Sequence, residues 1–272
     1  MRLLFVGLAT VDLIQRVPRV PGVNEKIQSD SVTMAAGGPA TNAAITAAAL
    51  APDYDVALMS AVGSHPLGAL IKADLTAHGV TLIDATPDAT DPPPVSAVTV
   101  LSTTGERTIV SHNAGTRAVP VPEMPEADLT LVDGHHPALA RAAARTARRL
   151  LVDAGSWRPV FTEIFPLAEV VACSADFRHP SATAPAQAIA APYVVVTHGP
   201  APVQWFTAEA KGEVPVPQVK AVDTTGAGDA FHGALAVALT TKELPEAIAY
   251  AAHTAAIRVS HAGPRTWLTH LR

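Results

Sequence analysis

Short, unbroken apolar runs recur along this chain and alternate with stretches of helical character. The first run is Leu3–Leu8, and runs of similar length follow at 56–63, 129–134, 150–155, 169–174 and 193–199. Helix-like stretches lie at 41–50, 66–78, 137–150 and 185–191, and 243–261 predicts a final helix. Strands that are apolar at every position are typical of sheets covered on both faces. The alternation predicts an α/β fold, in which a central, mostly parallel sheet carries helices on both faces.

Two other segments have a different pattern. Residues 23–34 and 95–112 alternate apolar with polar residues, which is typical of half-exposed antiparallel strands, and "TTGE" predicts a hairpin turn in the second. They predict a small second sheet, with strands around 13–34 and 93–114, within one domain of 1–272. Over the carboxyl ends of the main strands this sheet would act as a lid, because open α/β sheets bind ligands there. The alternative is a hairpin at the edge with no role.

Composition excludes several classes of protein. The 272 residues carry 19 Lys and Arg against 24 Asp and Glu, so nucleic acid is not an expected partner. The one cysteine fits a reducing compartment, and the eleven histidines form no zinc pattern. The apolar start is interrupted by Asp12, which argues against a signal peptide, and glycines and a proline interrupt the uncharged stretch 31–52, which argues against a membrane span. We expect a cytoplasmic protein.

The stretch 221–241, "AVDTTGAGDAFHGALAVALTT", places two glycines at the start of a helix of small residues. It lacks the lysine of a Walker A loop and the third glycine of the dinucleotide fingerprint. What remains is a run of backbone amides at Gly226, Ala227 and Gly228, at the positive end of a helix dipole, which predicts an anion site. Asp229 follows in the first turn. We expect the same dipole and amides to keep its carboxylate ionised, as a weak base suited to phosphoryl transfer, although an aspartate there is often only a helix cap.

A second group of residues lies near the amino terminus. In "AAGGPATNAA", Gly37 and Gly38 predict a tight turn before a helix, and Asn42 lies near the first turn of that helix. An amide donates and accepts, which suits the hydroxyls of a sugar. Asp12 follows the first strand, at the edge where such sheets bind ligands. Alone, Asn42 could be a surface residue and Asp12 a turn residue.

Together, "GGPATNAA" and "DTTGAGDAFHGALAVAL" resemble the N- and C-terminal signatures of the ribokinase-like, or PfkB, carbohydrate kinases, nearest to the ketohexokinase-like and sulfofructose kinase branch. The resemblance implies a ribokinase-like sandwich with a β-sheet lid. It also implies transfer of phosphate from ATP, with Mg²⁺, to a primary hydroxyl of a small sugar such as a ketohexose or pentose. Asp229 would be the catalytic base and 226–228 the anion hole, while Asp12, Gly37, Gly38 and Asn42 would bind the sugar.

The same resemblance implies roles for further residues. Arg107 would approach the phosphates beside the sugar, and the nucleotide would be bound by Thr197, Gly199, Thr225, Ala256 and Gly263. The family's Asn-x-x-Glu motif is reduced here to 173–176, where only Asp176 keeps a carboxylate to hold Mg²⁺ through water. Asp223 matches a ligand of a monovalent cation such as K⁺. Dimerisation through the lid is a further expectation. A nucleoside kinase and a catalytically silent sugar- or nucleotide-binding protein remain as alternatives.

Overall fold

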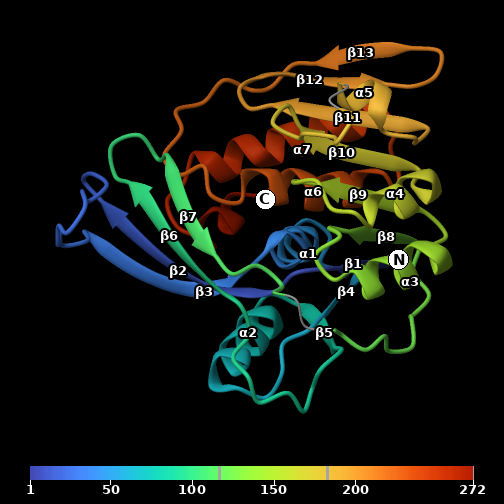
Figure 1. Cartoon of the computed structure of the whole chain (residues 1–272). Coiled ribbons are helices and arrows are strands. Elements are labelled where there is room, and N and C mark those ends of the chain that lie inside the picture. The colour runs from blue at the N-terminus through green and yellow to red at the C-terminus, as the bar shows by residue number, and fades with distance from the viewer. Residues whose placement is uncertain (116–117, 182–183, 272) are drawn as a thin grey trace.

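The main sheet of the protein consists of nine strands, in a computed structural model that describes residues 1–115, 118–181 and 184–271 (Figure 1). Their order is β13-β12-β11-β10-β9-β8-β1-β4-β5. The parallel strands are β1 (Arg2–Val6), β4 (Asp55–Ser60), β5 (Val80–Asp84), β8 (Leu129–Val132), β9 (Leu150–Ala154), β10 (Val170–Ser174) and β11 (Tyr193–His198). The antiparallel strands β12 (Ala201–Phe206) and β13 (Lys211–Val214) extend one edge. The predicted α/β class is confirmed.

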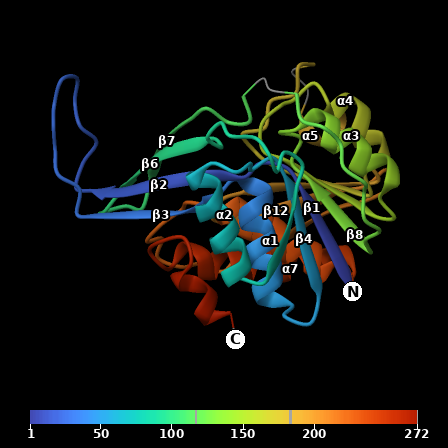
Figure 2. The same cartoon turned by 90° about the horizontal axis from the view of Figure 1, so that it is seen from below.

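Helices cover both faces of this sheet because alternate residues of each strand point to opposite sides. Leu3 and Phe5 of β1 join the core under α1 (Pro39–Leu50), α2 (Pro66–Ala77), α6 (Ala227–Ala238) and α7 (Leu244–Val259). Leu4 and Val6 join the core under α3 (Pro137–Thr146) and α4 (Phe161–Ile164), beside which lies α5 (Pro185–Ala188). The two layers lie on either side of the sheet in Figure 2. Within the described residues, no helix has the length and apolarity needed to cross a membrane.

Two predicted helices are shorter than the sequence pattern suggested. The helix predicted at 137–150 ends at Thr146, because Ala147 is extended and Leu150 already pairs in β9. The helix predicted at 185–191 is a single turn that ends at Ala188.

The small sheet has the order β3-β2-β6-β7 and projects from one side of the molecule (Figure 1). Its strands are β2 (Thr10–Val17), β3 (Ser31–Gly37), β6 (Val95–Leu101) and β7 (Arg107–Ser111). The "TTGE" hairpin is confirmed, because Gly105 adopts φ +72° and its N–H donates to the Leu101 carbonyl. The strand predicted at 23–34 begins only at Ser31. Before it the chain turns at Asn24, which has φ 61°, and Glu25 folds back to accept a hydrogen bond from Gly22 N–H.

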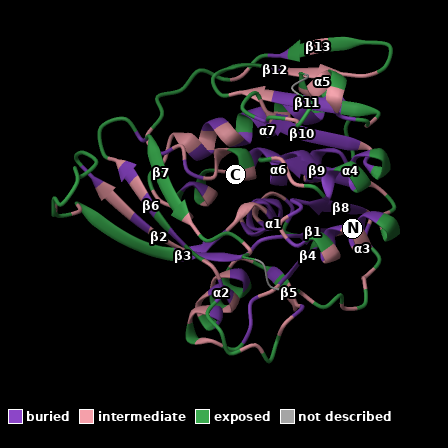
Figure 3. Cartoon of the chain, in the orientation of Figure 1, coloured by how far each residue is buried: buried purple, intermediate pink, exposed green. Residues whose placement is uncertain are grey.

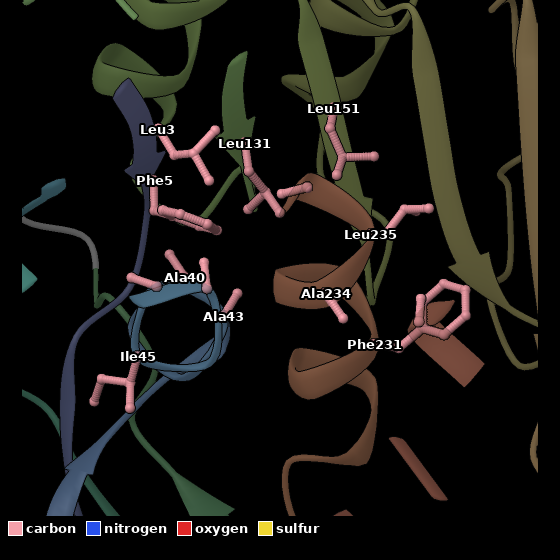
Figure 4. Packing of buried hydrophobic residues seen from close by; sticks show 14 of the residues in the cluster. Leu3, Phe5, Ala40, Ala43, Ile45, Leu131, Leu151, Phe231, Ala234 and Leu235 are labelled. Carbon is pink, nitrogen blue, oxygen red and sulfur yellow. The ribbon is translucent and has the colours of Figure 1, made fainter. Parts of the chain in front are cut away.

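Helices α1 and α6 cross closely, and this brings the two sequence signatures together (Figure 4). A Cβ atom at Gly233 of α6 would lie 2.3 Å from the Ala43 carbonyl oxygen and 2.8 Å from the Thr46 Cβ of α1. Ala43 of α1 and Ala234 of α6 belong to the same buried cluster. The small residues of α6 therefore set how near its first turn comes to Asn42.

Candidate active site

A cleft of about 250 Å³ lies between the small sheet and the amino-terminal ends of α1 and α6. It opens where the strand order reverses, between β1 and β8, which is where open α/β sheets bind ligands. Its lining includes half of the site residues predicted from the sequence: Asp12, Gly38, Asn42, Arg107, Thr225, Gly226, Gly228 and Asp229. Residues separated by more than two hundred positions thus share one site.

Buried Asp133 holds the loops at this edge of the sheet. It directly follows β8 and accepts hydrogen bonds from the N–H groups of Leu8 (2.9 Å) and Ala40 (3.3 Å). Although burial opposes it, His135 and the backbone amides hold the pKa of Asp133 well below its usual range. Its carboxylate therefore ties the end of β1 to the start of α1, while His135 lines the cleft.

Gly226 begins α6 in the left-handed conformation, with φ 70°. No side chain caps this end. The Ala227 N–H donates to the Thr224 carbonyl at 3.4 Å, and the other first-turn amides, which have no partner within the helix, can receive an incoming anion. A Cβ atom at Gly226 would lie 3.6 Å from Asp229 Oδ2, 3.8 Å from Asn42 Nδ2 and 3.9 Å from Arg258 Nε. The glycine thus leaves backbone, carboxylate and amide facing the same small space.

Asp229 is a stronger base than the sequence analysis expected. Burial raises its pKa to about 6, and the nearby negative charge of Asp153 adds to the rise, while the hydrogen bond from Asn42 opposes it. The expectation that this carboxylate is ionised at neutral pH holds, but its pKa is raised above the usual value, because burial outweighs the hydrogen bond from Asn42. At neutral pH the group is still largely ionised and close to the value at which a general base works best.

The amide of Asn42 is held between two charged side chains. Its Nδ2 donates to Asp229 Oδ2 at 2.8 Å, and its Oδ1 accepts from Arg265 Nη1 at 3.1 Å. Arg265 also donates to the Ala36 carbonyl at 2.7 Å and to Asp74 Oδ2 at 3.0 Å. A continuous chain of polar contacts therefore runs from Asp74 of α2 through Arg265 and Asn42 to Asp229.

Asp12 lies on β2, within the small sheet, rather than in the loop after β1. Thr10 donates to its Oδ1 at 2.6 Å, and burial raises the pKa of Asp12 against the effect of hydrogen bonds from Thr10 and Ser96. A Cβ atom at Gly37 would overlap the Asp12 carboxylate, and one at Gly38, with φ +98°, would lie 2.3 Å from the Leu8 carbonyl oxygen. Gly37 is thus required by the close packing of Asp12, and Gly38 by its backbone conformation and the nearby Leu8 carbonyl.

The small sheet contacts the loop before α6 directly. Arg107 Nη1 donates to Thr224 Oγ1 at 3.2 Å, and the Gly105 carbonyl accepts from both the N–H and the Oγ1 of Thr224 at 3.1 Å. Arg16 Nη2 donates to the Val222 carbonyl at 3.3 Å. The hairpin tip at Gly105 therefore forms one connected surface with the loop before α6, residues 222–226, which we call the anion loop.

Of the five residues predicted for the nucleotide, Thr225 lines this cleft and the other four do not. Thr197 and Gly199 lie at the end of β11, Ala256 is buried on α7, and Gly263 follows α7 with φ +87°. Asp176 follows β10 with its side chain 99% exposed. Its Oδ1 lies 4.0 Å from Arg178 Nη2. A single exposed carboxylate suits a role in holding water on a metal that the phosphates carry, since Mg²⁺ commonly uses few protein ligands. No group of three acidic, histidine or cysteine residues in the described chain forms a metal cage by itself.

Several residues of the site were not found from the sequence. Arg265 follows α7, beyond the final helix predicted at 243–261. Asp153 is the next-to-last residue of β9, and its Oδ2 lies 3.2 Å from Nδ1 of His232, which is one turn beyond Asp229 on α6. Although burial disfavours the imidazolium, Asp153 raises the pKa of His232. The position of Asp153 after an apolar run is the same signal that identified Asp12.

A doubly wound sheet, an uncapped helix end and an adjoining buried carboxylate fit a phosphotransferase. The chain belongs to the pfkB family of carbohydrate kinases, whose family model matches residues 1–270.

The chain is similar over most of its length to proteins that are named as kinases. It is 25% identical to a ribokinase of Lactococcus lactis, over 86% of this chain and 82% of the relative. It is 27% identical to an ATP-dependent ribose-1-phosphate kinase of Halopiger xanaduensis, over 97% and 94% of the two chains. A crystal structure from Agrobacterium tumefaciens, provisionally named a ribokinase, matches with a TM-score of 0.84 and 26% identity, over 99% and 95% of the chains.

Proposed function

We propose that this protein transfers the γ-phosphoryl group of ATP to a primary hydroxyl of a small sugar of the ketohexose or pentose type. One observation carries the proposal. Asp229 and the start of α6 line the same cleft as Asp12, Gly38 and Asn42. Its volume of about 250 Å³ suits an acceptor the size of a monosaccharide. The ribokinase and ribose-1-phosphate kinase relatives support an acceptor of this class.

The chain's own groups divide the work. Asp12 accepts hydrogen bonds from sugar hydroxyls, and Asn42 holds Asp229 toward the hydroxyl that reacts. Asp229 accepts the hydroxyl proton as the new O–P bond forms and the bond to ADP breaks. The amides of 226–228, preorganised at the helix end, stabilise the negative charge on the transferring group. Arg107 adds positive charge from the small sheet, which acts as a lid that excludes water.

For the nucleotide we propose the region of Thr197, Gly199, Thr225, Ala256 and Gly263, at the carboxyl ends of β10 and β11 and beside α7. The Mg²⁺ that accompanies ATP neutralises phosphate charge. Asp176 would hold its water shell, because Ser174 of β10 pairs with Thr197 of β11 and so brings the two loops side by side.

The lid also offers a surface for a second copy of the chain. Its outer strands β3 and β7 are exposed in Figure 3, and on the face turned away from the cleft they carry the exposed apolar side chains of Val32, Met34 and Val110. We propose a homodimer through this face. Light scattering after gel filtration should give twice the chain mass, and Val110→Lys should reduce it to the chain mass. A monomeric wild type would exclude the dimer.

The activity itself is tested by following ADP formation and ³¹P spectra with a panel of ketoses, pentoses, ribose 1-phosphate and nucleosides. We expect a phosphate monoester on a primary hydroxyl of one neutral sugar. A product only from nucleosides would identify a nucleoside kinase. Binding of sugars without any phosphorylated product would support the silent binding protein instead.

A further inference from the structure

Asp223 is a buried carboxylate in the anion loop. It is 1% exposed, and each of its oxygens accepts a backbone hydrogen bond, Oδ1 from Thr225 at 2.9 Å and Oδ2 from Gly263 at 3.0 Å. A buried charge of this kind needs a counter-charge. The resemblance to the PfkB kinases implies a monovalent cation at this position.

The side chain of Arg258 occupies that position. It is 3% exposed on α7, and its Nη2 lies 3.5 Å from Asp223 Oδ2. Its Nη1 donates to the His261 carbonyl at 3.0 Å and to the Asp223 carbonyl at 3.5 Å. One carboxylate and two carbonyl oxygens are the oxygen ligands that a hard cation would take, and all three face guanidinium nitrogens.

A second arginine, on the lid, adds to the positive charge near the Asp223 carboxylate. Arg16 Nη1 of β2 lies 3.9 Å from Asp223 Oδ2. Arg258 also lies under the anion loop, since its Nε is 3.9 Å from the point where a Cβ atom of Gly226 would be. The guanidinium of Arg258 is thus placed where a bound cation would stabilise the negative charge of the transferring phosphoryl group.

We infer that the Arg258 guanidinium replaces the monovalent cation at Asp223, so that this kinase works without K⁺. The inference rests on the proposed function and specifies how that activity responds to ions. A guanidinium stays protonated at any pH that the protein tolerates. Its charge is covalently attached, so the anion loop is supported at every K⁺ concentration.

The test compares wild type, Arg258→Ala and Arg258→Lys in KCl, NaCl and tetramethylammonium chloride at equal ionic strength. We expect the kcat/KM and the Tm of wild type to be the same in all three salts. Arg258→Ala should lose activity and stability in tetramethylammonium, and K⁺ should restore part of both. Arg258→Lys keeps a charge and should be less impaired, with little response to K⁺.

Arg149→Met is the matched control. Arg149 also pairs with a carboxylate, Glu169, and donates to the Leu239 carbonyl at 2.7 Å, at a site separate from the cleft. K⁺ should not change its activity or Tm relative to tetramethylammonium.

Activation or stabilisation of wild type by K⁺ would overturn the inference. So would an Arg258→Ala protein whose Tm responds to K⁺ no more than that of Arg149→Met. The Tm comparison does not depend on turnover, so it tests the replacement even if no sugar is phosphorylated, a result that would count against the proposed function alone.

Discussion

The pKa of Asp229 should depend on one hydrogen bond, from Asn42. That bond is 2.8 Å long and favours the ionised carboxylate. A hydrogen bond to a charged group contributes about 1.5–3 kcal/mol, and one pKa unit corresponds to about 1.4 kcal/mol. Replacing Asn42 by Ala should therefore raise the pKa of Asp229 by roughly one to two units from its present value of about 6.

The pH profile of kcat/KM measures this shift in the free enzyme. A base must be ionised, so activity should fall below about pH 6 in wild type, tenfold per pH unit. In Asn42→Ala the fall should begin at about pH 7–8, whatever the loss in maximal rate. In Asp153→Asn, activity should begin to fall only below about pH 6, at a lower pH than in wild type, because the substitution removes the negative charge that raises the pKa of Asp229.

Thr41→Ala is the control on the same helix, because Thr41 donates to the Leu8 carbonyl at 3.0 Å, away from Asp229. Its profile should match that of wild type. The contrary result would be a loss of activity in Asn42→Ala that begins at the same pH as in wild type, or at a lower pH. Either the hydrogen bond from Asn42 would then not stabilise the ionised carboxylate, or the loss of activity at low pH would not report the protonation of Asp229.

Three further predictions concern packing and positioning. Gly233→Ala should lower the free energy of unfolding by about 1–3 kcal/mol in urea titrations, because its Cβ would overlap α1; Gly155→Ala, whose Cβ would be 3.8 Å from its nearest neighbour, should cost much less. Arg265→Ala should lower kcat/KM about 10- to 100-fold, because it releases the Asn42 amide. The control is Arg19→Ala, which removes an exposed pair with Glu25 and should leave kcat/KM unchanged. If both variants lost kcat/KM equally, Arg265 would have no positioning role. Cys173 is buried and burial raises its pKa to about 12, so Ellman's reagent should find no reactive thiol in native protein and one after denaturation; rapid reaction of the native protein would contradict this burial.

The predictable parts of the structure are those with a local cause. The apolar runs identified strands such as β1 and β8, because strands covered on both faces need apolar residues at every position. Gly226 and Gly38 identified two helix starts, since their backbone conformations exclude most side chains. The antiparallel strands β12 and β13 were not predicted, because their mixed composition has no such pattern.

The missed parts of the site depend on tertiary packing. Arg265 contacts Asn42 across more than two hundred residues, and nothing in its neighbours signals that contact. Asp153 and His232 meet only because α6 packs over β9. The strength of Asp229 as a base was misjudged for the same reason, since burial is a property of the folded chain and the helix dipole can be inferred from the sequence alone.

The most direct test of the account is phosphoryl transfer by Asp229→Asn, measured with the sugar that wild type phosphorylates. The substitution keeps the size of the side chain and removes the base, so kcat should fall about 10²- to 10⁴-fold. Calorimetry should show that the variant still binds the sugar, and its Tm should remain close to that of wild type. Turnover at the wild-type rate in a folded, sugar-binding Asp229→Asn protein would contradict the account.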